Sequence, residues 1–130
     1  MGQQQLLLII LGVIIVGIAV AIGISLFQTN KEESDKDQCV QDINSILQNA
    51  YQFRIKPSSL GGGNNSYTGY AIPAKMVSNV NLDVALAYAL DGTPDATSCK
   101  VKAASATVAT YLNGIGGSIS AAGVVTITGR

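Results

Sequence analysis

The sequence predicts an α+β fold in which one long N-terminal helix packs on a small antiparallel β-sheet head. Three observations carry this prediction: an uncharged apolar run near the N-terminus, an amphipathic pattern after it, and alternating strand-like segments in the second half. We expect the helix over residues 1–56 and the head over residues 57–130. Within the helix, residues 29–56 should pack on the head, whereas residues 1–28 have no polar face for water.

The charge balance excludes several classes of function. The chain of 130 residues carries eight Lys and Arg against eight Asp and Glu, and it has no His. Binding of nucleic acid by charge needs an excess of basic side chains, which is missing. The lack of His removes the commonest general base and the usual nitrogen ligand for metals, so we expect no enzyme activity, cofactor or metal site. All sixteen charges lie between Lys31 and Arg130.

The apolar run LLLIILGVIIVGIAVAIGISLF occupies residues 6–27, and Ser25 is its only polar side chain. As a helix that rises about 1.5 Å per residue it reaches roughly 33 Å, enough to cross the hydrocarbon core of a membrane. A cleaved secretory signal would have a shorter apolar region, basic residues before it and a small-residue cleavage site after it. We therefore expect a helix that spans or embeds in lipid.

The helix should continue past this run through a mixed-charge stretch at residues 31–37. Apolar residues then recur at intervals of three and four, the pattern of an amphipathic helix. They are Val40, Ile43, Ile46, Leu47, Ala50, Tyr51 and Phe53. No Pro occurs before Pro57, and no Gly occurs between Gly23 and Gly61. One continuous helix of roughly 80 Å is expected, ending at the proline.

Two segments of the head predict a hairpin. Residues 82–90 alternate apolar side chains with Asp and Ala, and residues 99–103 alternate apolar side chains with Lys. The loop at residues 91–97 would join them. Residues 103–113 place apolar side chains at helical spacing before Gly114, with a strand as the alternative.

The C-terminal residues predict the closing part of the sheet. Residues 118–128 resemble two short strands that turn at Ala121, Ala122 and Gly123. No charge occurs between Lys102 and Arg130. Such an uncharged stretch suggests a surface that packs against neighbouring subunits.

Cys39 and Cys99 are the only thiols in the chain. If the head lies outside the cytoplasm, we expect an intrachain disulfide between them that pins the sheet to the helix. Closing a loop of about 60 residues is worth on the order of 4 kcal/mol in the chain-entropy model. Two inert buried thiols and an intersubunit bond are the alternatives.

The order of these elements resembles a type IV pilin. The polar residues GQQQ precede the apolar run, which merges into a long helix. A loop with Tyr67 and Tyr70 leads into AIPAKMV, which is similar to the segment between helix and sheet in many pilins, and VTITG is similar to a closing strand. The resemblance covers the layout of the whole chain, with specific motifs only in residues 1–25 and 66–77.

The resemblance implies an assembly site at the start of the helix. Its residues are Gln3, Gln4, Gln5, Leu6, Leu7 and Leu8. Type IV pilins usually carry Glu at the fifth mature position, where it pairs with the N-terminal amine of a neighbour. Gln5 cannot form that ion pair, but it can accept a hydrogen bond and costs less to bury than a carboxylate. We expect the three glutamines to surround the N-termini of neighbouring subunits.

Two further features depart from the pilin pattern. Prepilins carry a charged leader that ends in Gly, whereas here we expect Met1 to be the first mature residue and the site of N-methylation. Cleavage after Gly2 is the alternative. Most bacterial pilins have Pro near position 22, where this chain has Ile22. If the helix melts on assembly, Gly17 and Gly23 would permit it, because Gly weakens a helix by roughly 1 kcal/mol relative to Ala.

The resemblance implies a structural subunit that polymerises into an extracellular type IV pilus-like filament for adhesion, surface attachment or motility. Residues 1–28 would lie in the inner membrane before assembly and in the filament core afterwards. The implied partners are other copies of the chain, the membrane, the prepilin peptidase and the assembly machinery. Two alternatives stay open: a pseudopilin of a type II secretion system, and a single-span membrane protein with a small binding head that never polymerises.

Overall fold

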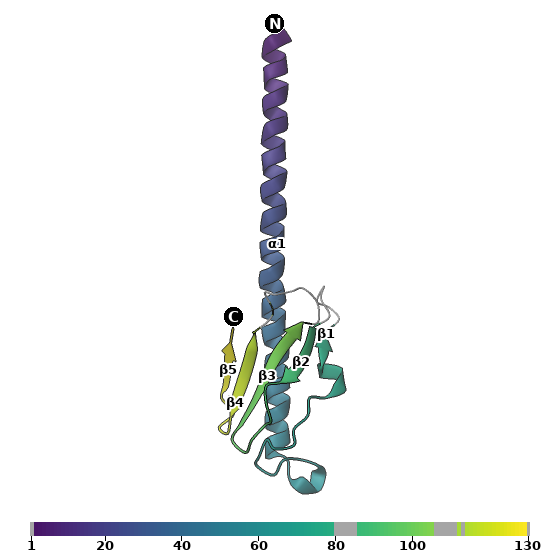
Figure 1. Cartoon of the computed structure of the whole chain (residues 1–130), viewed down its shortest axis with the longest axis vertical. Helices are drawn as coiled ribbons and strands as arrows, with labels where there is room; N and C mark the ends of the chain where they lie inside the picture. Colours follow the sequence, from purple (N-terminus) through teal and green to yellow (C-terminus); the bar gives the residue numbers. More distant parts are fainter. Residues whose placement is uncertain (1, 80–85, 106–111, 113, 130) are drawn as a thin grey trace. The chain divides into compact units, whose positions relative to one another are not determined.

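The computed structural model describes residues 2–79, 86–105, 112 and 114–129. They form one long helix and a small antiparallel sheet, so the expected α+β class is confirmed (Figure 1). The chain divides into two compact units, Met1–Ser34 and Asp35–Arg130. The second unit therefore contains the latter part of the helix together with the whole head.

Helix α1 spans Gly2–Ile55, 54 residues without a break, close to the expected range. It ends before Pro57, which adopts an extended conformation with φ −66° and ψ 151°. Pro lacks a backbone N–H and disfavours helical geometry in the residue before it, so the helix cannot continue through Lys56. The position of the helix end was thus predictable from one residue.

The backbone after the helix caps its last carbonyl groups. The N–H of Gly63 donates to the carbonyl oxygen of Phe53 at 2.8 Å, and the N–H of Asn65 donates to that of Arg54 at 2.6 Å. The last four carbonyls of a helix have no partner within it, so these bonds take the place of water. We call residues 61–65 the capping loop.

Five strands follow two short 3₁₀ turns, η1 (Ser58–Leu60) and η2 (Ala74–Met76). The strands are β1 (Ser78–Asn79), β2 (Leu86–Leu90), β3 (Ser98–Ser105), β4 (Gly116–Ser120) and β5 (Val125–Thr128). Each strand pairs antiparallel with the next one in the chain, so the sheet order is the sequence order. This is a simple meander, in which short connections suffice.

Most of the strand predictions are confirmed where they can be compared. The hairpin of β2 and β3 is present, although residues 82–85 lie outside the described residues. The turn between β4 and β5 is also present, and the N–H of Gly123 donates to the carbonyl oxygen of Ser120 at 3.0 Å. This turn lies at the predicted residues, Ala121, Ala122 and Gly123.

The helix predicted over residues 103–113 is wrong for its first three residues, which complete β3. Ala103, Ala104 and Ser105 pair with residues of β2, so their backbone groups find partners across the sheet. Sheet pairing over a long sequence distance outweighs the helical tendency of alanine here. Leu112 and Gly114 lie in a turn, and the rest of the predicted helix is outside the described residues.

The core of the second unit lies between helix α1 and one face of the sheet. The amphipathic stripe faces inward as predicted: Ile43, Ile46, Leu47 and Ala50 are buried against Val101, Ile119 and other residues of the head. Gly117 of β4 marks the closest approach, because an added Cβ would lie 2.8 Å from side-chain carbons of both Ile43 and Leu47. A glycine within a strand commonly marks such an approach.

Candidate membrane and assembly segment

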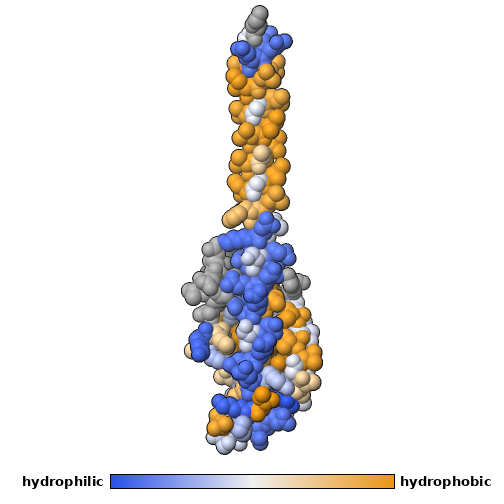
Figure 2. Space-filling view, turned by 180° about the vertical axis from the view of Figure 1, so that it is seen from behind, coloured by the Kyte–Doolittle hydropathy of each residue, from blue (hydrophilic) through white to orange (hydrophobic). Residues whose placement is uncertain are grey.

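The first functional feature is the apolar segment, residues 6–27 of helix α1. Its large apolar side chains are 53% to 69% exposed. Outside this segment, the exposed large apolar residues of the described chain are Ile55, Leu60 and Val124. On the face shown in Figure 2 the segment is hydrophobic along its length apart from small near-white patches, and hydrophilic surface lies beyond both of its ends. A helix that is apolar on all sides is normally buried in lipid or in other protein.

The segment is long and apolar enough to cross a membrane, by its length and composition. Each large apolar side chain that leaves water contributes roughly 1.5–3 kcal/mol, so burying the segment is worth tens of kcal/mol. The expected membrane insertion is therefore compatible with the structure. The same energy would be gained in any environment that excludes water from the whole circumference of the helix.

A neutral polar group precedes the apolar segment. Gln3, Gln4 and Gln5 are exposed on the first turns of helix α1, and this first turn has no acidic residue. Successive residues lie about 100° apart around a helix, so the three amides cover more than half of its circumference. The first backbone N–H groups of a helix also lack partners, which adds donors to the same end. Met1, the expected site of processing, lies outside the described residues.

The glycines of the apolar segment sit in regular helix. Gly17 and Gly23 are both helical, and a Cβ added at either one would meet nothing within 4 Å. Neither glycine is therefore needed for packing within the chain. Their expected role in local melting stays a prediction, because helix α1 is unbroken here.

The expected disulfide is not formed. Cys39 and Cys99 are both free thiols, and both are completely buried. Cys39 lies on helix α1, where its thiol hydrogen-bonds the hydroxyl oxygen of Tyr88, whereas Cys99 lies on β3 opposite Ile119. Both thiols belong to the buried core cluster, which corrects the prediction in favour of its first alternative, two buried thiols. Burial raises the pKa of each thiol to about 11.

One polar cluster in the core was not predicted. The Tyr88 hydroxyl donates to Oδ2 of Asp42 at 2.8 Å, which joins β2 to helix α1. Burial, and then this hydrogen bond, raise the pKa of the Tyr88 hydroxyl far above its usual value. No sequence spacing could indicate the pair, because the partners are 46 residues apart. The cluster connects helix α1 to β2 of the sheet.

No group of three His, Cys, Asp or Glu side chains suited to a metal ion occurs among the described residues. The carboxylates of Asp91 and Asp95 both interact with residues close to them. Asp91 forms an exposed ion pair with Lys102 at 3.4 Å, and Asp95 accepts hydrogen bonds from the backbone of Thr97 and Ser98. These backbone bonds hold the pKa of the Asp95 carboxyl below its usual value.

Comparison of the chain with protein-family models, with curated proteins and with solved structures gave no match. The function is therefore inferred from the chain itself. Its two informative parts are the apolar segment with its neutral polar end, and the compact second unit.

Proposed function

We propose that this protein is a structural subunit that polymerises through its apolar segment into a type IV pilus-like filament at the cell surface. One observation carries the proposal: a helix with an apolar circumference and no charge over its first thirty residues continues in the same chain as a folded head. Such a segment needs an environment without water, and neighbouring copies of itself can supply it.

The mechanism would be an exchange between two apolar environments. Before assembly the segment lies in the inner membrane, and afterwards it packs among identical segments in the filament core. Both environments bury a similar apolar area, so the exchange is nearly balanced even though each state lies tens of kcal/mol below exposure to water. The chain needs help from a prepilin peptidase and an assembly machinery to drive this step in one direction.

The neutral polar residues at the start of helix α1 suit a segment that leaves the membrane for a filament core. Residues 2–5 comprise Gly2 and three glutamines and carry no charge. Moving Gln3, Gln4 and Gln5 through lipid costs less than moving charged side chains. The amides can then hydrogen-bond the N-terminal amines of neighbouring copies in the filament core.

Substitution of Gln5 by Leu tests this mechanism. We expect Gln5→Leu to lower the yield of filaments in sheared surface material, seen by negative-stain microscopy with peptide mapping, while the amount of chain in the membrane stays unchanged. Gln41→Leu, at an exposed position of the second unit, is the control and should give the normal yield.

Three results would change the conclusion. Normal filament yield from Gln5→Leu would remove the role of the amide cluster. Short periplasmic fibres without surface filaments would favour the pseudopilin of a type II secretion system. A chain that stays in the membrane and forms no fibre without detergent would favour the single-span membrane protein.

A further inference from the structure

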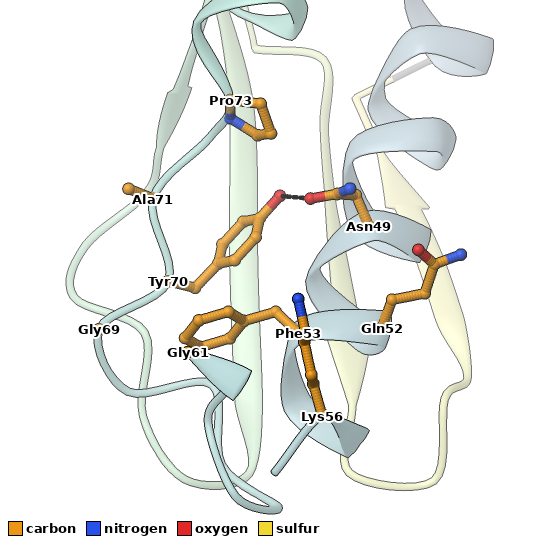
Figure 3. A pocket seen from close by; sticks show the side chains of 9 residues that line it. All are labelled: Asn49, Gln52, Phe53, Lys56, Gly61, Gly69, Tyr70, Ala71 and Pro73. Carbon is orange, nitrogen blue, oxygen red and sulfur yellow. Dashed lines mark hydrogen bonds between the residues drawn. The ribbon is translucent and has the colours of Figure 1, made fainter. Parts of the chain in front are cut away.

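A pocket of about 560 Å³ lies at the C-terminal end of helix α1, within the second unit (Figure 3). Small-molecule sites commonly enclose about 300–1,000 Å³, so the volume suits a ligand of a few rings at most. We call it the helix-end pocket, and the proposed filament gives it no role. Its lining residues that matter below are Asn49, Gln52, Phe53, Lys56 and Tyr70.

Two aromatic rings form one wall of the helix-end pocket. The centroids of Phe53 and Tyr70 are 5.5 Å apart and their planes are tilted by 57°. Tyr70 is only 5% exposed. Its hydroxyl donates to Oδ1 of Asn49 at 3.0 Å and also lies 3.3 Å from the carbonyl oxygen of Ile46, a second acceptor. Phe53 is half-buried, so part of its ring remains open to the pocket.

The wall is held in place without any ligand. The capping loop is bonded to the end of helix α1, and Gly63 packs so closely that an added Cβ would lie 2.9 Å from Cε1 of Phe53. Gly62 is equally constrained, because an added Cβ would collide with the carbonyl oxygen of Lys56. A preformed site loses little conformational freedom when a ligand binds, which favours binding of a small molecule.

The polar side chains around this wall are two amides and one ammonium. Because Oδ1 of Asn49 accepts from Tyr70, its Nδ2 group remains to donate to a ligand. Gln52 and Lys56 are exposed, and their side chains form no hydrogen bond or ion pair with the described residues. Lys56 is the one charged side chain in the lining, so the helix-end pocket is positive.

We propose that the helix-end pocket binds a pyranose that carries a carboxylate. The C–H groups on one face of a pyranose pack on an open aromatic ring, here Phe53, while its hydroxyl groups pair with amides such as Asn49 and Gln52. A carboxylate on the same sugar accepts a charge-assisted hydrogen bond from the ammonium of Lys56. A proline-rich peptide fits less well, because it docks in a groove lined by accessible aromatic rings, whereas the Tyr70 ring is almost fully buried.

The test uses the full-length chain in zwitterionic micelles, because detergents with sugar head groups would compete for the site. Saturation-transfer NMR would compare methyl glucuronide with methyl glucoside, which differ in one carboxylate. We expect transfer to the ring protons of both, with the glucuronide bound about two- to fivefold more tightly, as for an exposed ion pair. The measurement needs no filament, so its failure and that of the proposed function are separate.

Three variants identify the site. Lys56→Gln should remove the preference for the glucuronide and leave glucoside binding unchanged. Gln52→Ala should weaken both sugars about two- to tenfold, the range for one hydrogen bond, and Phe53→Leu should weaken both while keeping apolar packing. Gln48→Ala and Lys100→Gln are exposed controls outside the lining and should bind as the parent does.

The proposal is overturned if neither sugar shows transfer, if Lys56→Gln keeps the preference, or if the controls weaken binding as much as the pocket variants. Transfer from a proline-rich peptide but from neither sugar would also overturn it. Thermal unfolding of each variant in the same micelles shows whether the head is folded. If Phe53→Leu is unfolded, Gln52→Ala and Lys56→Gln decide the outcome, because both residues are exposed.

Discussion

At the scale of single residues, buried tyrosine hydroxyls connect parts of the second unit that are distant in sequence. Tyr88 bonds Asp42 across helix and sheet, and Tyr67 donates to the carbonyl oxygen of Ser120 at 2.8 Å, which joins the loop to the end of β4. Loss of one partner from a buried hydrogen bond costs about 1–3 kcal/mol, because the other partner remains unsatisfied. These two bonds thus help to fix the position of the sheet relative to helix α1 and to the loop.

Cys39 and Cys99 should react with maleimide only after the chain unfolds. Burial raises the pKa of both thiols to about 11, and the reactive thiolate is therefore scarce at neutral pH as well as shielded from the reagent. Mass spectrometry of the full-length chain, without reductant, should find no adduct in micelles and two adducts in concentrated guanidinium chloride. If the denatured chain forms no adduct until a reductant is added, the two cysteines are joined by a disulfide after all.

At the scale of elements, the contact between helix α1 and β4 depends on the absence of a side chain. The space that a Cβ at Gly117 would need is filled by Ile43 and Leu47 on one side and by Ile127 on the other. The helix can therefore approach the sheet closely, which buries Ile43, Ile46, Leu47 and Ala50 of its apolar stripe almost completely. Interiors packed this densely have little room for even one methyl group.

Gly117→Ala should lower the free energy of unfolding by about 1–3 kcal/mol, the usual cost of an added group in a packed core. Denaturant unfolding followed by circular dichroism of the head measures this. Ser118→Ala, next to it on the half-buried opposite side of β4, should change the free energy by no more than about 0.5 kcal/mol. Equal losses in both variants would show that the close approach is not the cause.

The sequence predicted those elements whose signal is local. The apolar stripe, the stop at Pro57 and the turn before β5 all depend on neighbours within a few residues. The extension of β3 through Ser105 was only the alternative to a helix, because its partners lie on another strand, β2, and alanine suits a helix equally well. The Tyr88–Asp42 bond and the helix-end pocket were missed for the same reason: each exists only after distant segments meet.

At the scale of the whole molecule, the two units differ in what they need from their surroundings. The second unit, Asp35–Arg130, contains every buried apolar residue of the described chain. The first unit, Met1–Ser34, contains nearly all of the large exposed apolar ones. Folding of the head and partition into an apolar medium are therefore carried by separate stretches of sequence.

A chain of residues 35–130 should accordingly be folded and monomeric in water without detergent. Size-exclusion chromatography and circular dichroism would check this, with the full-length chain in micelles as the reference for the signal of the folded head. The full-length chain should associate or precipitate once the detergent is removed, because its apolar segment is exposed. An unfolded or aggregated 35–130 chain would show that the head needs the first unit.

The capping loop and the end of helix α1 are joined by backbone hydrogen bonds. The backbone N–H groups of residues 63–65 donate to the carbonyl oxygens of Phe53, Lys56 and Arg54, so the loop and the end of the helix stabilise each other. Opening of the loop therefore favours fraying of the last helical turn. A ligand in the helix-end pocket, which is lined by the end of the helix and by Gly61 of the loop, would therefore slow the opening of both.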